Sequence, residues 1–179
     1  CSSEPAAIYK ASLVRRLAGD IACTPSKATV PASSEACNVT TMVDLTGGLG
    51  VDFSFVSRCF SRAIYVERNE NLCAIARHNL PLLGVNNAEV YCDDAVSYLQ
   101  NMGHVNLIFM DPARRDSHGG RTYALEDCTP NVVEMCEELL KKSHFIVLKL
   151  SPMLDWHRAV EQLRGVMEVH GVSGGGECK

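Results

Sequence analysis

Acidic side chains follow three apolar segments at positions from which they could bind the parts of a single ligand. Asp44 opens a glycine-rich turn, and a carboxylate there can accept hydrogen bonds from an ammonium group, directly or through water. Glu67 ends the next apolar segment, about twenty residues after the glycines, where an acid can accept both hydroxyls of a ribose. Asp94 follows the third segment, where a carboxylate can accept a hydrogen bond from an adenine amino group. Ammonium, ribose and adenine together describe S-adenosylmethionine, which the sequence therefore predicts as the cofactor.

The glycine-rich turn lacks the features of two other nucleotide-binding turns. A dinucleotide fingerprint would need a third glycine at position 53, which is Phe, and a P-loop would need Gly-Lys-Ser/Thr, which is absent. Both of those turns bind phosphate groups, whereas a carboxylate at the strand end suits a ligand with an ammonium group. We expect Asp52, at the end of the turn, to be a helix cap. The residues expected to bind the cofactor are Asp44, Thr46, Gly48, Gly50, Glu67 and Asp94.

Asp111 follows another apolar segment and is itself followed by Pro112. Methyl transfer from a sulfonium is an in-line displacement, and because the cofactor carries the reactive carbon, the enzyme mainly has to place and orient a nucleophile. A carboxylate can accept a hydrogen bond from an amine N–H and direct the nitrogen lone pair at the methyl group. Asp111 and Pro112 are therefore the predicted catalytic residues.

Three arginines near the predicted catalytic pair form a local basic cluster: Arg114, Arg115 and Arg121. They are the candidates for binding substrate, because guanidinium groups contact the phosphates of RNA. Arg114 and Arg115 could instead form structural ion pairs with nearby acids, and both interpretations stay open. Lys149, which follows a later buried segment, could pair with a carboxylate or contact substrate.

The composition of the 179 residues limits the partners of the chain. The formal net charge is −4, whereas a protein that binds nucleic acid unaided usually has a basic balance, so an RNA substrate would need a local basic patch or a segment outside this sequence. The nine cysteines include no C-x-x-C pair, so we expect no metal, and unpaired thiols in this number suit a reducing cytoplasm. No apolar run is long enough to span a membrane.

Strand-like and helix-like patterns alternate from residue 41 onward. Short apolar segments separated by helical patterns predict an α/β fold, a doubly wound, mostly parallel sheet with helices on both faces. Residues 1–40 are expected to form an N-terminal helix over 3–18 and a linker, and residues 41–179 the cofactor-binding domain. The expected strands are Thr41–Leu45, Ala63–Glu67, Glu89–Cys92, Val105–Met110, Phe145–Leu150 and Val166–Val172. The expected helices are Val51–Ser61, Glu70–Leu80, Ala95–Asn101, Asn131–Lys142 and Leu154–Arg164.

The same residues carry a resemblance to the class I, Rossmann-like methyltransferases that use S-adenosylmethionine. The turn 44–50, Asp-Leu-Thr-Gly-Gly-Leu-Gly, resembles motif I of that class, with Thr46 where many members have the first glycine. Glu67, Asp94 and Asp111 fall where motifs II, III and IV are expected. The resemblance implies methyltransferase activity and the class I fold, whose sheet ends in an antiparallel pair of strands. Because a single candidate strand follows the final expected helix, the last strand of that sheet is expected to be missing.

A closer resemblance is to the bacterial methyltransferases of the THUMP-like family. Members of that family carry further segments on both sides of this region, so flanking domains of the full-length protein are expected to assist substrate binding. The segments that carry the resemblance are Cys1-Ser2-Ser3-Glu4, Tyr9-Lys10-Ala11, Asp111-Pro112-Ala113-Arg114-Arg115 and Lys149-Leu150-Ser151-Pro152.

Related amine methyltransferases suggest an RNA base as the acceptor. Their D/N-P-P-aromatic motif is similar to the Asp-Pro pair at 111, although Ala113 and Arg114 here replace the second proline and the aromatic residue that would stack on a base. The glycine-rich turn also resembles that of ribosomal RNA guanine-N2 methyltransferases, and trimethylguanosine synthases share the Asp-Pro pair. Guanine N2 in RNA is therefore the favoured acceptor. The alternatives are a methyltransferase for a small molecule or a protein, and a non-catalytic module that only binds the cofactor.

Overall fold

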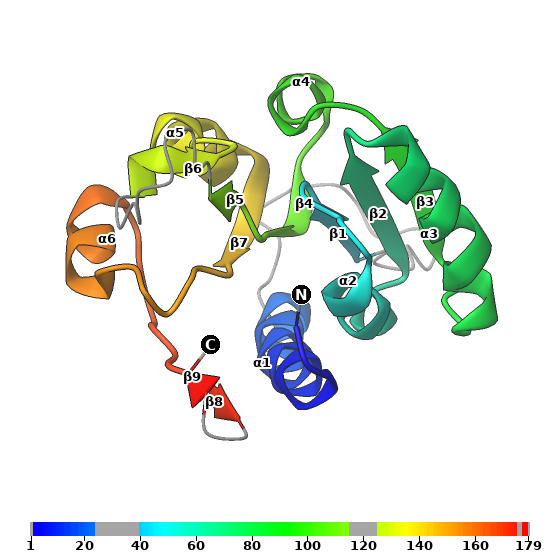
Figure 1. The fold of residues 1–179 in the computed structure, drawn as a ribbon, viewed down its shortest axis with the longest axis horizontal. Coiled ribbons are helices and arrows are strands. Elements are labelled where there is room, and N and C mark those ends of the chain that lie inside the picture. Colours follow the sequence, from blue (N-terminus) through cyan, green and yellow to red (C-terminus); the bar gives the residue numbers. More distant parts are fainter. Residues whose placement is uncertain (1, 24–39, 115–124, 175–176, 179) are drawn as a thin grey trace, which may run out of the picture.

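Five parallel strands form one sheet in the order β3-β2-β1-β4-β7 (Figure 1). The structure is a computed structural model that describes residues 2–23, 40–114, 125–174 and 177–178. The strand order and the helices around the sheet confirm the predicted doubly wound fold. The five strands lie within two residues of their predicted bounds: β1 (Thr41–Asp44), β2 (Arg62–Glu67), β3 (Ala88–Cys92), β4 (Val105–Met110) and β7 (Ser143–Leu148).

The helices begin mostly at polar caps whose side chains accept backbone N–H groups. Asn69, Asp94, Asn131 and Asp155 each accept from two N–H groups of the first turn, which satisfies donors that have no partner inside the helix. These caps start α3 (Glu70–Leu82), α4 (Ala95–Asn101), α5 (Val132–Lys142) and α6 (Trp156–Gln162). The other helices are α1 (Glu4–Cys23), α2 (Val51–Val56), η1 (Ser57–Cys59) and η2 (Leu125–Asp127). Two further strand pairs are antiparallel: β5 (Ala113–Arg114) with β6 (Cys128–Thr129), and β8 (Ser173–Gly174) with β9 (Glu177–Cys178).

Successive residues of each central strand face two different cores, because side chains alternate across a strand. In β4, Leu107 and Phe109 pack under α1, α2 and α3, whereas Ile108 and Met110 pack under α4 and α5. Helices therefore cover both faces of the sheet (Figure 1). Burial on both faces explains why the central strands are almost continuously apolar in sequence.

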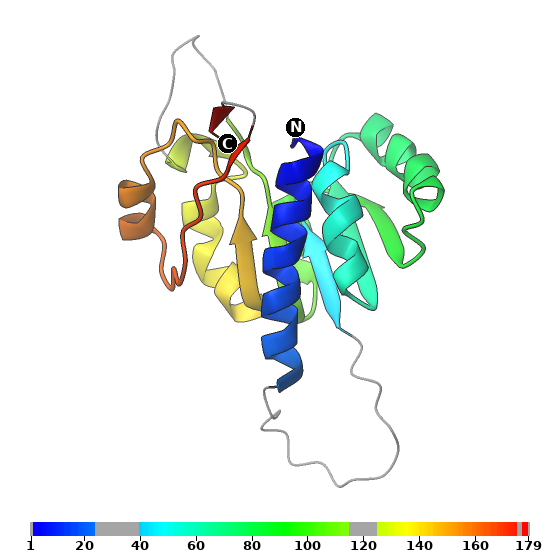
Figure 2. The same cartoon turned by 90° about the horizontal axis from the view of Figure 1, so that it is seen from below.

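The first helix lies across the face of the sheet that α2 also covers (Figure 2). Ala11 and Val14 are buried there in the same core as the strands, and the N-terminal end of α1 lies at the edge where the strands end. The helix continues to Cys23, five residues beyond its predicted end. The linker expected after it falls largely in 24–39, outside the described residues. None of the described helices is long and apolar enough to cross a membrane.

The predicted sixth strand, Val166–Val172, is wrong. Residues 163–172 have no strand partner and leave apolar side chains exposed, with Met167 at 80%. The segment is attached to α1 instead: Glu168 pairs with Arg16, and the Tyr9 hydroxyl lies 2.8 Å from Nδ1 of His170. Side-chain contacts with a helix, rather than a strand edge, therefore position it.

Candidate cofactor and acceptor site

The predicted site residues meet at one edge of the sheet because they follow parallel strands, whose carboxyl ends all lie on the same side. A cavity of about 300 Å³ opens at this edge. Its lining includes all six residues expected to bind the cofactor together with Asp111: Asp44, Thr46, Gly48, Gly50, Glu67, Asp94 and Asp111. Pro112, the other predicted catalytic residue, is buried beside the cavity and is not among its lining residues.

The glycine-rich turn lies directly against an aromatic side chain from the neighbouring strand. A Cβ atom on Gly47 would lie 2.2 Å from Cε2 of Tyr65, which no real side chain tolerates. The Tyr65 hydroxyl donates to the carbonyl of Gly48, and Gly47 N donates to the carbonyl of Val66 at 2.9 Å. Gly50 then begins α2 in the left-handed conformation, with φ of 75°. These contacts fix the backbone conformation of the turn, which lines the cavity.

Glu67 ties the end of β2 to the glycine-rich turn. Its carboxylate accepts the N–H of Gly48 at 3.0 Å and the N–H of Asn69 at 2.9 Å. Asp94 similarly accepts backbone N–H groups at the start of α4, both through Oδ1. The two acids therefore shape the wall where a ribose and an adenine are expected.

Asp44 is a buried acid at the bottom of the cavity. Burial raises its pKa to about 7, and the negative charges of Asp52 and Asp111 add to the effect. Both hydrogen bonds from Thr46, from its N–H at 2.9 Å and its hydroxyl at 3.3 Å, end on Oδ1. A cation bound at this carboxylate would relieve the cost of ionising it. An ammonium group is therefore the ligand that suits Asp44 best.

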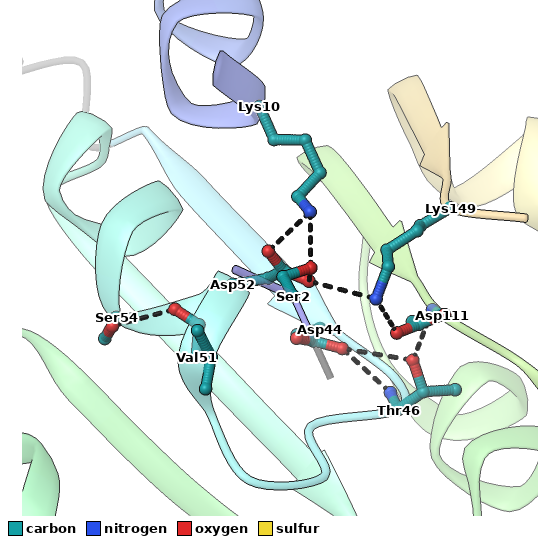
Figure 3. Close-up of polar contacts among 9 residues, drawn as sticks. All are labelled: Ser2, Lys10, Asp44, Thr46, Val51, Asp52, Ser54, Asp111 and Lys149. Atoms are coloured by element: carbon teal, nitrogen blue, oxygen red, sulfur yellow. Dashed lines mark hydrogen bonds and ion pairs between the residues drawn. The ribbon is translucent and has the colours of Figure 1, made fainter. Parts of the chain in front are cut away.

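Thr46 connects the two halves of the site. Its hydroxyl donates to Asp44 and accepts the N–H of Asp111 at 2.6 Å (Figure 3). The residue that replaces the first glycine of motif I thus fixes the start of the acceptor loop relative to the turn. A glycine at this position could not make either hydroxyl bond.

Two lysines join the acids of the acceptor side into a chain of charges (Figure 3). Lys149, just after β7, pairs with Asp111 and lies 3.4 Å from Oδ2 of Asp52. Lys10 of α1 lies 2.7 Å from Oδ1 of Asp52. Burial works against the charge of Lys149, but the hydrogen bond and attraction of Asp111, together with Asp52, outweigh it, so the pKa of Lys149 is raised. Lys149 therefore stays protonated at neutral pH.

The contacts of Asp52 and Lys149 bear on two expectations from the sequence. Asp52 is not a helix cap: Gly50 begins α2 without a side-chain bond, and Asp52 faces the two lysines instead. Lys149, for which two roles were open, pairs with carboxylates. Arg114 lies in the short strand β5, and Arg115 and Arg121 lie outside the described residues, so their contact with substrate stays a prediction.

Several site residues were not identified as such from their spacing in the sequence. Lys10 and Ser2 stand in the N-terminal segment, far from the other site residues along the chain, and Arg68 lines the cavity after Glu67. The close approach of Gly47 to the ring of Tyr65 is likewise invisible to spacing. The resemblance at Cys1-Ser2-Ser3-Glu4 and Tyr9-Lys10-Ala11 indicated that the N-terminal segment matters, but it gave Ser2 and Lys10 no role.

The cavity fits the groups of S-adenosylmethionine. Its volume lies at the lower end of the range for ligand pockets. Asp52 and Asp111 pair with the ammonium groups of Lys10 and Lys149, and Asp44 is a third carboxylate close enough for both of these acids to raise its pKa. This described cluster can therefore take up one further positive charge at Asp44. No group of described residues has the arrangement of a metal site.

The family described as conserved hypothetical protein 95 matches residues 31–170 of the chain, well over half of its length. A proposed methyltransferase from Porphyromonas gingivalis W83 is 34% identical, with a TM-score of 0.61 over 85% of this chain and 42% of that chain. No curated protein matches the sequence.

Two more distant structures show the same fold. The SAM-dependent methyltransferase from Agrobacterium tumefaciens is 17% identical, with a TM-score of 0.56 over 88% of this chain and 48% of that chain. The O-methyltransferase from Bacillus cereus, in complex with SAH, is also 17% identical, with a TM-score of 0.54 over 80% and 54%. This chain spans about half the length of these relatives. The fold is therefore that of the class I methyltransferases.

Proposed function

Since this chain belongs to the conserved hypothetical protein 95 family and has the class I methyltransferase fold, we propose that it is an S-adenosylmethionine-dependent methyltransferase. The acceptor we favour is a base amine of RNA, guanine N2 above others, and the full-length protein is a THUMP-like enzyme of the cytoplasm. Flanking domains, with Arg114, Arg115 and Arg121, assist in binding the RNA.

The observation that carries the proposal is the position of Asp111 beside the Asp44 pocket. Both side chains line one cavity, and the hydroxyl of Thr46 donates to the Asp44 carboxylate and accepts the backbone N–H of Asp111. Asp44 is the partner for the ammonium group of the cofactor, with Glu67 for the ribose and Asp94 for the adenine. When bound, S-adenosylmethionine supplies a methyl group on a sulfonium to the acceptor side of this cavity.

Asp111 orients the acceptor. The ion pair with Lys149 engages Oδ2, which leaves Oδ1 to accept an N–H from an amine, and the side chain, which lines the cavity, is 40% exposed. A carboxylate in this position aims the nitrogen lone pair and stabilises the positive charge that develops on nitrogen during transfer. The methylated aromatic amine then releases its proton to water, so no strong base is required beforehand.

Methylation of fractionated RNA by the full-length protein with labelled cofactor tests the proposal. We expect label in RNA, and Asp111→Ala should lower kcat at least about a hundredfold because the acceptor loses its orientation. Asp111→Asn should retain more activity than Asp111→Ala, since its amide oxygen can still accept the N–H. Cofactor affinity should be unchanged in both variants.

Three outcomes would contradict parts of the proposal. Label in a small molecule or a protein, but not in RNA, would replace the substrate class. Cofactor binding without label in any fraction would favour a non-catalytic binding module. Full turnover by Asp111→Ala would remove Asp111 from the reaction.

A further inference from the structure

We infer that α1 is part of the acceptor site, where Lys10 acts through Asp52 and Lys149 as a positioning residue for Asp111. The catalytic consequence of this inference rests on the proposed function, whereas the positioning itself does not. Lys10 lies on α1, outside residues 31–170 that the family match covers. The helix would thus contribute to the site from outside the matched region.

Lys10 is a buried lysine whose ammonium group has polar partners. Its side chain is 11% exposed, and its ammonium group lies 2.7 Å from Oδ1 of Asp52, whose own side chain is 10% exposed. It also donates to the hydroxyl of Ser2 at 2.6 Å, and that hydroxyl donates to Oδ2 of Asp52 at 2.7 Å. Burying a lysine is costly unless it is paired and hydrogen-bonded. The N-terminal part of α1 is therefore built around the Asp52 carboxylate.

The two carboxylate oxygens of Asp52 face different lysines, so Asp52 connects Lys10 to Lys149. Oδ1 faces Lys10, and Oδ2 faces Lys149 at 3.4 Å. Lys10 and Ser2 hold the plane of the carboxylate, and the carboxylate in turn holds the ammonium group of Lys149. A lysine side chain has four flexible bonds, so a second anchor matters for its placement. Lys149 is thereby kept against Oδ2 of Asp111.

The consequence for the acceptor is geometric. Asp111 is attached to the turn by its backbone N–H, which donates to Thr46, and its carboxylate is oriented by Lys149. Displacement of Lys149 would free the carboxylate to rotate, and loss of the ion pair would also loosen the backbone on which each of its two residues lies. Loss of Lys10 should therefore disturb acceptor orientation and leave cofactor binding intact, because Asp44 and Glu67 are held by the glycine-rich turn and its neighbouring backbone N–H groups.

The test compares Lys10→Met with Glu168→Gln in the full-length protein. Glu168→Gln is the matched control because it weakens a different ion pair of α1, the exposed pair between Arg16 and Glu168. This pair does not include Lys10, Asp52, Lys149 or Asp111. By amide hydrogen exchange, we expect Lys10→Met to accelerate exchange several-fold in peptides covering 111–113 and 149–151, and Glu168→Gln to leave those peptides unchanged. Ser2→Ala should accelerate exchange in the same peptides by a smaller factor. If Lys10→Met does not fold, the result for Ser2→Ala tests the inference in its place.

Kinetics provide the second measurement. We expect Lys10→Met to lower kcat tenfold to about a hundredfold, with the Kd for S-adenosylhomocysteine within twofold of the wild type. Exchange changes confined to α1, or equal in Lys10→Met and Glu168→Gln, would overturn the inference while leaving the proposed function intact. If Lys10→Met accelerates exchange at 111–113 but the wild-type protein methylates no substrate, the positioning role of Lys10 is supported and the proposed function is rejected.

Discussion

Binding of S-adenosylhomocysteine should tighten as the pH rises from 5 to 7, because the carboxylate that receives its ammonium group becomes ionised in that range. The pKa of Asp44 is raised to about 7, chiefly by burial. An acid is charged above its pKa, so Asp44 is mostly neutral at pH 5 and half ionised at pH 7. The α-amino group of the ligand keeps its proton throughout this range.

The size of the effect follows from the ionised fraction. With a pKa of about 7, roughly 1% of Asp44 is ionised at pH 5 and about half at pH 7. If only the ionised form binds the ammonium group, affinity should rise roughly 50-fold between these values. Ordinary carboxylates, with pKa values near 4, have largely finished titrating at pH 5 and contribute little.

Isothermal titration calorimetry at several pH values measures this change, and two controls isolate its source. Methylthioadenosine lacks the amino-acid part, so its affinity should not depend on pH over the same range. Asp44→Asn cannot ionise, so it should bind S-adenosylhomocysteine weakly and almost equally at pH 5 and 7. The reasoning is refuted if the wild type, folded at both values, binds S-adenosylhomocysteine equally well at pH 5 and pH 7.

Two further substitutions test the walls of the cavity. Gly47→Ala should destabilise the protein by about 1–3 kcal/mol in urea unfolding, because its Cβ would lie 2.2 Å from the Tyr65 ring, whereas Gly103→Ala, with nothing within 4 Å, should be nearly neutral. Equal stability of these two variants would contradict the close contact. Glu67→Ala should weaken binding of S-adenosylhomocysteine at least about tenfold by calorimetry, because it removes both the ribose acceptor and the anchor of the Gly48 N–H. Glu67→Gln should fall between Glu67→Ala and the wild type, and unchanged affinity in Glu67→Ala would leave the residue a purely structural role.

The fold could be predicted where local pattern and simple topology rules act together. Short apolar strands alternating with amphipathic helices allow few arrangements, and parallel strands bring their carboxyl ends to one edge. That is why Asp44, Glu67, Asp94 and Asp111, each at the end of a strand, line one cavity as their spacing suggests. The bounds of α4 and β4 also agree with the pattern, since both are short elements with clear ends.

The same local pattern misled at Val166–Val172. These residues resemble a strand, but a strand exists only when another strand offers it hydrogen bonds, and that partner is a non-local property. In the structure, β7 is the last strand of the described sheet on that side, and the segment contacts α1 through side chains. Propensity alone could not distinguish the two outcomes.

Periodicity and residues close together in the chain were therefore enough to predict the five strands of the sheet, the helices around it and the acids at its carboxyl edge. What each charge faces depends on the folded arrangement of distant segments. Asp52 looks like a helix cap in its local sequence, yet its partner Ser2 is 50 residues away and Lys149 follows a different strand. Ion pairs are selected by proximity in space and by shared burial, and neither is encoded in local spacing.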